Sequence, residues 1–264
     1  MAPWQRRKQA WIASLASLRP DLIINTGDNL GHPDAVRGIR AAFAGFRGIP
    51  GAFVHGSNDL FASAPRNPLR YFLGPSKNHS REVRLDTEAM DSFFTSTLGW
   101  HDVNNAAATV DVHGRRVNLV GVNDAHRNWD RLDLLPGLFD QLQAASTDLD
   151  GDGLAAPEAD PHPLTVAVTH APYRRVLDAF TGAGADVIFG GHTHGGQVRV
   201  PGFGALVANC DIPLKQASGL SSWHRLGHTA ALNVSAGLGH SIYAPVRFAC
   251  PPEASLLTLV AREA

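Results

Sequence analysis

A pattern that occurs five times along the chain constrains its fold most strongly. Each time, a strand-sized apolar run is followed at once by a short segment of Gly, Asp, Asn and His. Ligands of open α/β sheets bind beyond the carboxyl ends of the strands, so five such polar tips are expected to converge on one patch. Any single tip also has the composition of an ordinary loop. The tips are residues 26–29, 56–59, 123–126, 169–172 and 190–197.

Hydrophobic periodicity predicts an α/β fold with mixed sheets and a single domain over residues 1–264. A long surface excursion is expected at residues 60–80, which hold several Pro, Asn and Gly. In the first predicted helix, one apolar stripe contains Trp4, Trp11, Leu15 and Leu18. Helices are expected at residues 3–18, 34–46, 87–98 and 132–142. Strands are expected at residues 22–25, 52–55, 107–112, 116–122, 164–169, 187–189, 205–209, 230–234 and 256–260.

The overall charge argues against nucleic-acid binding. The 23 Lys and Arg are balanced by 24 Asp and Glu, which leaves a net charge of −1 and no basic block. The apolar runs have the length of strands and are too short to span a bilayer. Two cysteines, Cys210 and Cys250, cannot form a thiolate metal cage. We expect the chain to lie in the cytoplasm or at the periphery of a membrane.

The glycine-rich segment 190–197, GGHTHGGQ, carries the most specific pattern. His192 and His194 could be surface residues, but the flanking glycines let both rings face one side, which favours metal binding. Imidazole, carboxylate and Asn oxygen together suit Mn, Fe or Zn. The lack of thiolate ligands argues against a structural zinc site.

The ordered tips resemble the motifs of calcineurin-like metallophosphoesterases. The matching segments are Gly27-Asp28, the tetrad at 56–59, THAP at 169–172 and GHTHGGQ at 191–197. The last motif is similar to that of a bacterial branch related to UDP-diacylglucosamine and lipid-phosphate hydrolases. The resemblance implies a calcineurin-like sandwich of two mixed β-sheets flanked by helices, with two divalent metal ions. It also implies hydrolysis by a hydroxide that bridges the two ions.

Carried over by position, the resemblance assigns the metal ligands. Asp28 would bridge both ions, His170 and His192 would complete one site, and His194 would belong to the other. The tetrad departs from the family pattern, Gly-Asn-His-Asp or Gly-Asn-His-Glu, because it reads Gly-Ser-Asn-Asp. Without a gap, Ser57 falls on the metal-binding Asn. A shift of one residue, which we favour because an amide oxygen is the better ligand, makes Asn58 the ligand.

The same tetrad lacks the histidine that assists the leaving group in the family. His126 is a candidate to replace it, and a purely structural role for this residue is equally compatible with the sequence. Asp59 is expected to support the ligands rather than act in catalysis. Asn123 and Asp124 are expected to contact substrate or to orient ligand histidines.

A second departure concerns the family's opening motif, a strand that ends in Asp-x-His and supplies two ligands to the first metal. The segment Asp124-Ala125-His126 has the right letters but follows the second and third motifs, so it is not the counterpart. The first metal then retains only Asp28 and His194, and one site is nearly complete. We expect Met1 to be a misassigned or artificial start, with an upstream strand, an Asp-x-His and a membrane contact or anchor before it.

The acidic segment at residues 148–153, DLDGDG, imitates the start of a calcium-binding loop. The closing bidentate Glu is missing, since Ala159 occupies that position. A solvated acidic loop is therefore the preferred interpretation.

These residues predict a metal-dependent hydrolase of a phosphomonoester, phosphodiester or pyrophosphate. The substrate would be a small phosphate ester or a lipid-linked one. Catalytic roles are expected for Asp28, Asn58, His126 and His194, and metal ligation for Asp28, Asn58, His170, His192 and His194. The alternative is a catalytically impaired protein that binds a single metal or a phosphate.

Overall fold

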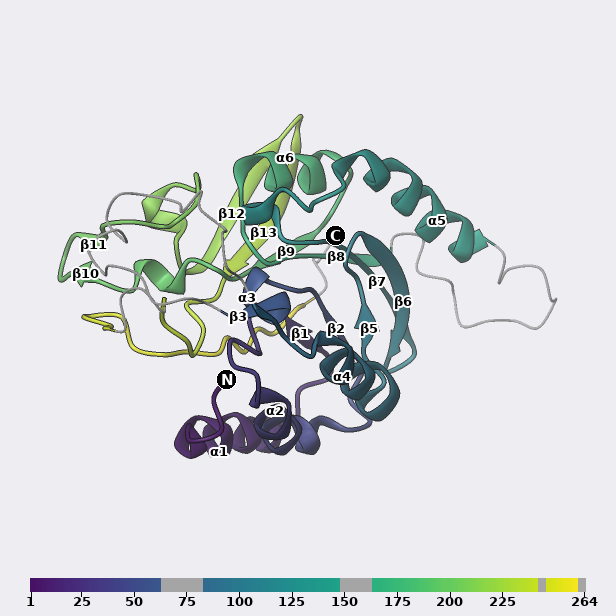
Figure 1. Ribbon diagram of the computed structural model, residues 1–264. Coiled ribbons are helices and arrows are strands. Elements are labelled where there is room, and N and C mark those ends of the chain that lie inside the picture. The colour runs from purple at the N-terminus through teal and green to yellow at the C-terminus, as the bar shows by residue number, and fades with distance from the viewer. Residues whose placement is uncertain (63–82, 148–162, 242–245, 261–264) are drawn as a thin grey trace.

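The computed structural model describes residues 1–62, 83–147, 163–241 and 246–260 of the 264-residue chain. Two β-sheets lie face to face, with helices on the outer side of each (Figure 1). The helices are α1 (Arg6–Ser14), α2 (Ala35–Phe43), α3 (Ser57–Leu60), α4 (Thr87–Ser92), α5 (Leu135–Thr147) and α6 (Arg174–Gly182).

The larger sheet has six strands in the order β12-β13-β9-β8-β7-β6. Its central pairings, β13 with β9, β9 with β8 and β8 with β7, are parallel, and both outer pairings are antiparallel. These strands are β6 (Ala106–Val112), β7 (Arg115–Val122), β8 (Leu164–Thr169), β9 (Val187–Gly190), β12 (Gly219–Arg225) and β13 (His228–Val234). The sheet is therefore mixed, as predicted.

The smaller sheet has three strands in the order β1-β2-β5, and both of its pairings are parallel. Its strands are β1 (Ile23–Asn25), β2 (Gly51–Phe53) and β5 (His101–Asp102). The expected pair of mixed sheets is thus one mixed sheet and one parallel sheet. Two short antiparallel pairs complete the described strands: β3 (Phe61–Ala62) with β4 (Val83–Arg84), and β10 (Arg199–Val200) with β11 (Gly204–Ala205).

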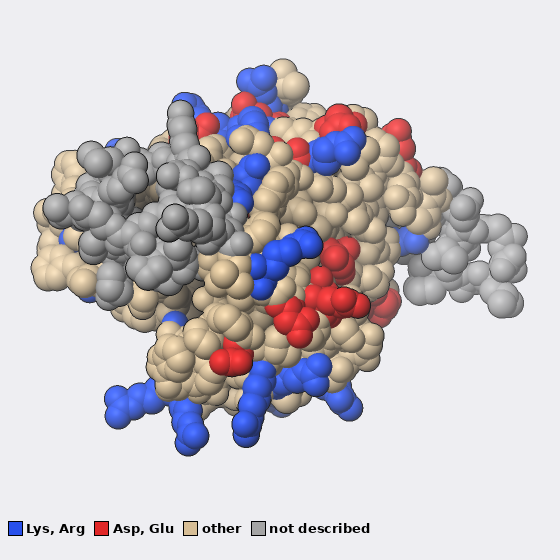
Figure 2. Space-filling model, viewed as in Figure 1, with Lys and Arg blue, Asp and Glu red and all other residues tan. Residues whose placement is uncertain are grey.

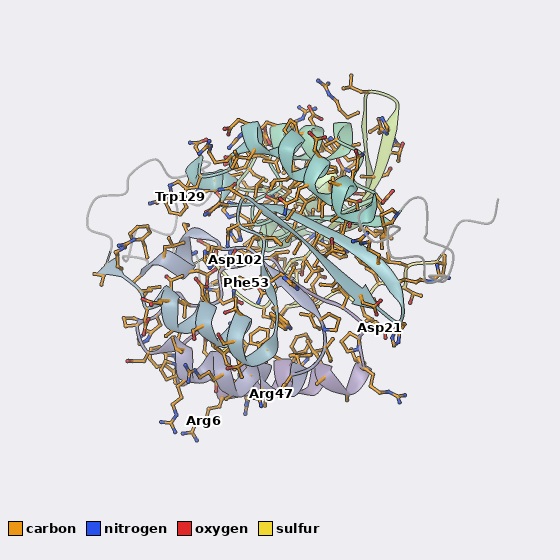
Figure 3. The ribbon with its side chains drawn as sticks, turned by 90° about the vertical axis from the view of Figure 1, so that its right-hand side faces the viewer. Arg6, Asp21, Arg47, Phe53, Asp102 and Trp129 are labelled. Carbon is orange, nitrogen blue, oxygen red and sulfur yellow. The ribbon has the colours of Figure 1, made fainter. Side chains whose placement is uncertain are left out.

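Three apolar clusters hold the layers together. The one between the sheets contains Val54, Leu119 and Val166, all fully buried. A second cluster lies between the smaller sheet and helices α1, α2 and α4, and a third lies between the larger sheet and α5 and α6. Figure 3 shows Phe53 in the interior, with Arg6 and Arg47 on the outer side of the helical layer. The apolar runs of β7 and β8 are buried because both faces of the sheet are covered.

The predicted apolar stripe of the first helix is wrong. Trp4, Trp11 and Leu18 are 71%, 40% and 53% exposed, and Ile12 is the buried residue of α1. Since a helix buries only the face that meets a neighbour, α1 packs on α2 through a face rotated away from the tryptophans. In Figure 2, Lys and Arg gather along the edge where α1 lies, while Asp and Glu cluster on an adjacent part of the surface.

Two predicted strands also differ from the structure. Residues 256–260 form no strand, and Leu256 and Val260 are 60% and 82% exposed. The strand expected at 205–209 shortens to Gly204–Ala205, and Asn209 takes a positive φ of 58° that ends any extended run. Strand β12 was not predicted, because its sequence GLSSWHR lacks an apolar alternation. Within the described residues, no helix is long and apolar enough to cross a membrane.

Candidate metal centre

The predicted site residues meet at one cavity of about 2150 Å³. They come from loops that follow strands of both sheets, so the strand-end pattern does bring distant segments together. All six predicted residues border this cavity: Asp28, Asn58, His126, His170, His192 and His194.

Asp59 connects two of these loops, the one after β1 and the one after β2. It is fully buried, and its carboxylate accepts four backbone N–H hydrogen bonds. Three come from Asp28, Asn29 and Leu30 after β1, at 2.7, 2.6 and 2.9 Å, and one comes from Gly56 after β2, at 3.0 Å. The carboxylate thus holds the carboxyl ends of two neighbouring strands in fixed relation, which agrees with the supporting role expected for it.

Asp28 contacts both a neighbouring loop and the larger sheet. The backbone N–H of Asn58 donates to its Oδ1 at 3.0 Å, and Asn58 Nδ2 donates to its Oδ2 at 2.7 Å. His170 Nε2 lies 3.5 Å from the same Oδ2. The backbone N–H of Ser57 instead donates to Asp124 Oδ2 at 3.0 Å. Of the two alternatives in the tetrad, Asn58 is the residue whose side chain contacts Asp28.

Gly56 is required by this close approach. A Cβ at this position would lie 2.1 Å from Asp28 Oδ1 and 2.6 Å from His170 Cε1. Gly27 faces the same constraint from the opposite loop, with a φ of 90° and a Cβ position 2.5 Å from the Gly56 nitrogen. A side chain at Gly56 would force the carboxylate and the imidazole apart, and one at Gly27 would force the two loop backbones apart.

His170 and His192 form the imidazole pair. His170 Nδ1 donates to the carbonyl oxygen of Thr26 at 2.7 Å, which leaves the lone pair on Nε2 directed at Asp28. His192 Nδ1 lies 3.2 Å from His170 Nε2. On its other side, His192 Nε2 is 3.3 Å from both the carbonyl oxygen and the Nδ2 of Asn209. A backbone carbonyl that orients a ring is the usual partner of a metal-ligating histidine.

These separations suit donor atoms that share one ion. Ligand atoms about 2.1 Å from a tetrahedral ion lie roughly 3.4 Å from each other, and Asp28 Oδ2, His170 Nε2 and His192 Nδ1 follow one another at 3.5 and 3.2 Å. Among the described residues, no group of three or more His, Cys, Asp and Glu converges as a metal site. The donor types suit a divalent ion, and the spacing matches that of shared ligands for two successive pairs of atoms, with the amide of Asn58 beside them.

Electrostatics favour the ligating forms of Asp28 and His192 and oppose the ligating form of His170. Burial alone would raise the pKa of Asp28, but His170 and the hydrogen bonds from Asn58 hold it below its ordinary value. Burial, together with the neighbouring His126, His170 and His194, lowers the pKa of His192 well below its ordinary value. For His170, burial would lower the pKa, but the Asp28 and Asp124 carboxylates raise it. An ionised carboxylate thus faces imidazoles of differing basicity.

His194 lies on a loop whose backbone takes left-handed conformations. Its φ is 50°, and Gly195 and Gly196 follow with φ of 66° and 79°. Thr193 Oγ1 anchors this loop by donating to the carbonyl oxygen of Ala217 at 2.7 Å. Burial lowers the pKa of His194 to about 4 despite the nearby Asp28, so its imidazole is neutral at pH 7.

His126 lies beside His192, with the two ring centroids 4.5 Å apart. Its Nδ1 is 3.1 Å from the hydroxyl of Tyr173, and its backbone N–H donates to Asp124 Oδ1 at 2.8 Å. Asp124 is fully buried and bonds both this loop and that of Ser57. The structure therefore places the 123–126 tip beside the imidazole pair.

Asn209 and Tyr173 are residues of this region that the strand-end motifs do not predict, and Thr26 lies in the first tip without a predicted role. Thr26 acts through a backbone carbonyl, which carries no residue signature. Asn209 is the last residue of a predicted strand that barely forms, and it opens a polar run, Asn-Cys-Asp, that repeats the strand-end pattern. The acidic segment at 148–153 lies outside the described residues.

The model of the family "Calcineurin-like phosphoesterase" matches residues 5–196, which includes well over half of the chain and the motifs up to His194. No curated protein matches.

Among solved structures, a 5'-nucleotidase precursor from Thermus thermophilus is 14% identical with a TM-score of 0.41, over 90% of this chain and 46% of that one. The NAD nucleotidase of Haemophilus influenzae is 11% identical with a TM-score of 0.41, over 86% and 43%. A sulfate thiohydrolase from Thermus thermophilus is 13% identical with a TM-score of 0.39, over 87% and 38%. The chain spans less than half the length of each. From the match to the family model, the chain belongs to the calcineurin-like phosphoesterase family.

Proposed function

We propose that this metallophosphoesterase hydrolyses a phosphomonoester, a phosphodiester or a pyrophosphate with two divalent ions at the Asp28 centre. The substrate is a small phosphate ester or a lipid-linked one. One observation carries the proposal: Asp28 Oδ2, His170 Nε2 and His192 Nδ1, from three separate strand ends, follow one another at 3.5 and 3.2 Å. Residues 144 positions apart in sequence also join here through the hydrogen bond of His170 to Thr26.

Asp28, Asn58, His170 and His192 would hold one ion, and Asp28 and His194 would contribute to the second. Mn, Fe and Zn all suit this mixture of carboxylate, amide and imidazole donors. When bound, such ions lower the pKa of water and neutralise charge on phosphoryl oxygens.

The chain's own residues prepare the site for that chemistry. Asp59 fixes the Asp28 backbone, and the Thr26 carbonyl fixes the tautomer of His170, so the donor atoms need little reorganisation when they are used. Neutral His192 and His194 present lone pairs at pH 7. His126, oriented by the Tyr173 hydroxyl at 3.1 Å, would hydrogen-bond the leaving-group oxygen in place of the absent tetrad histidine.

A second candidate is a protein that binds one ion, or a phosphate, without turnover. It is favoured by the lack, within the described ranges, of any converged group of three His, Cys, Asp or Glu.

Metal content and turnover separate the two. The full chain is loaded with Mn, Fe or Zn, its metal content is measured by mass spectrometry, and it is assayed with a chromogenic phosphodiester, nucleotides, sugar nucleotides and lipid phosphates. Two ions per chain with metal-dependent turnover support the hydrolase. One ion without turnover of any of these compounds supports the second candidate and contradicts the first.

A further inference from the structure

The segment after β13, residues 235–241, is tied to residues 247–253 by one arginine. Arg247 directs its guanidinium at backbone carbonyl oxygens of both segments. The acceptors are Gly239 from Nε at 2.7 Å, Ala236 and Gly237 from Nη2 at 2.5 and 2.9 Å, and Cys250 and Pro251 from Nη1 at 3.3 and 3.2 Å. Because these oxygens belong to no strand ladder, the side chain takes the place of a β-sheet partner.

Other side chains complete the same arrangement. Glu253 Oε1 accepts from the backbone N–H of Ala236 at 2.7 Å, and the N–H of Glu253 donates to the carbonyl oxygen of Gly237 at 3.1 Å. Gln197 Oε1 accepts from the N–H of Ser241 at 2.6 Å. Figure 1 shows the yellow C-terminal segment beneath the β10–β11 hairpin, where Phe248 bridges to Val198. We call Arg247 with Glu253 the clasp.

Both segments that the clasp joins, residues 235–241 and 247–253, pack against the His194 loop. A Cβ on Gly239 would lie 3.6 Å from His194 Cε1, so this backbone borders the imidazole directly. Cys250 Sγ donates to the carbonyl oxygen of His194 at 3.3 Å. A Cβ on Gly195 would lie 2.7 Å from Ala236 Cβ and 2.8 Å from Cys250 Sγ, which leaves the loop no room to shift toward them.

We propose that Arg247 is a positioning residue for His194, which it acts on by holding residues 236–239 and 250 against the loop and ring of that histidine. This inference rests on the proposed function, in which His194 ligates an ion. Arg247 itself contacts neither substrate nor ion. Its guanidinium is suited to this role because five N–H groups in a planar fork reach several carbonyls at once, whereas a lysine ammonium has three donors on a flexible stem.

The test compares R247A and R247K with H194Q and with a matched arginine control, R199A. Arg199 is half-buried and donates to Ser218 Oγ at 3.3 Å. Binding of Mn and of Zn alone is measured by calorimetry, and amide hydrogen exchange is followed at residues 192–197 and 235–241. R247A is expected to weaken one ion-binding event by about tenfold or more, as H194Q does, and to speed exchange in both segments.

Millimolar guanidinium is expected to restore metal affinity to R247A and not to H194Q, while R247K stays impaired and R199A resembles the wild type. The inference is overturned if R247A melts at a lower temperature but keeps wild-type metal affinity and wild-type exchange at 192–197. If R247A does not fold, R247K decides on the same readouts. If the wild type binds no ion, the proposed function fails. Hydrogen exchange then tests the clasp alone, and unchanged exchange at 192–197 in the variants contradicts it.

Discussion

The two halves of the centre hold their donor atoms on different kinds of support. Asp28 follows β1 of the smaller sheet and His170 follows β8 of the larger sheet, and each strand is paired with a neighbour in its own sheet. A buried carboxylate fixes the loop that holds Asp28. His194 follows β9 on a loop that is packed against residues 236–239 and 250, which side chains rather than a strand ladder hold in place. Ligand geometry can thus be set by sheet register or by side-chain bonds to backbone carbonyls. The second is weaker, because each such bond stands alone.

The largest expected effect comes from the residue shared by both halves. Asp28→Asn removes the charge that the proposed ions would share and should lower kcat/KM for a chromogenic phosphodiester by about 10³-fold or more. Steady-state kinetics with saturating Mn check this, with an exposed histidine variant, His228→Asn, as the control. A rate within tenfold of the wild type would show that Asp28 is not at the reacting centre.

Alanine substitutions of two glycines test how tightly each half of the centre is packed. Gly56→Ala places a Cβ 2.1 Å from Asp28 Oδ1, whereas the Cβ of Gly239→Ala lies 3.6 Å from His194 Cε1, an ordinary contact. The first substitution is expected to cost about 3 kcal/mol of unfolding free energy and the second less than about 1 kcal/mol. Urea denaturation of the metal-free chains measures both. Equal losses would remove the distinction between the halves.

A pair of acid-to-amide substitutions compares the supports themselves. Asp59→Asn weakens an acceptor of four backbone N–H groups, and Glu253→Gln weakens an acceptor of one from Ala236. We expect losses of about 2 kcal/mol and about 1 kcal/mol, respectively, because hydrogen bonds to charged acceptors are the stronger ones. Denaturant midpoints at constant m-value report these losses. A larger loss for Glu253→Gln would mean that the clasp contributes more to the stability of the centre than the loops at the strand ends do.

The smallest expected effect is a pH dependence of the free energy of unfolding, which comes from His55 in the half of the centre that the sheets support. Burial alone would lower the pKa of His55, but its hydrogen bond to Asp91 at 2.8 Å and nearby carboxylates raise it above the ordinary value of 6.5. The stabilisation is therefore complete below pH 6.5 and is lost as the pH rises through the raised pKa. Asp91→Asn should reduce this change of the unfolding free energy with pH, by about 1 kcal/mol in total. Identical pH profiles for the wild type and the variant would contradict the assignment.

The same comparison explains what the sequence could and could not predict. Strand-end motifs placed Asp28, Asn58, His170, His192 and His194 around one cavity, because apolar runs that end in polar tips report sheet topology directly. The clasp was not predicted, since Arg247 acts on carbonyl oxygens, which every residue type offers. Strand β12 was missed because its sequence lacks an apolar alternation. The exposure of Trp4 and Trp11 was missed because periodicity shows that a segment is amphipathic, but its neighbours decide which face is buried.

The central claim is that Asp28, His170 and His192 hold a catalytic ion, and anomalous X-ray diffraction from crystals of the Zn-loaded or Mn-loaded chain tests it most directly. The predicted result is an anomalous peak about 2.1 Å from Asp28 Oδ2, His170 Nε2 and His192 Nδ1. A peak only at other histidines, or no peak in crystals of chain that hydrolyses phosphoesters, would contradict it.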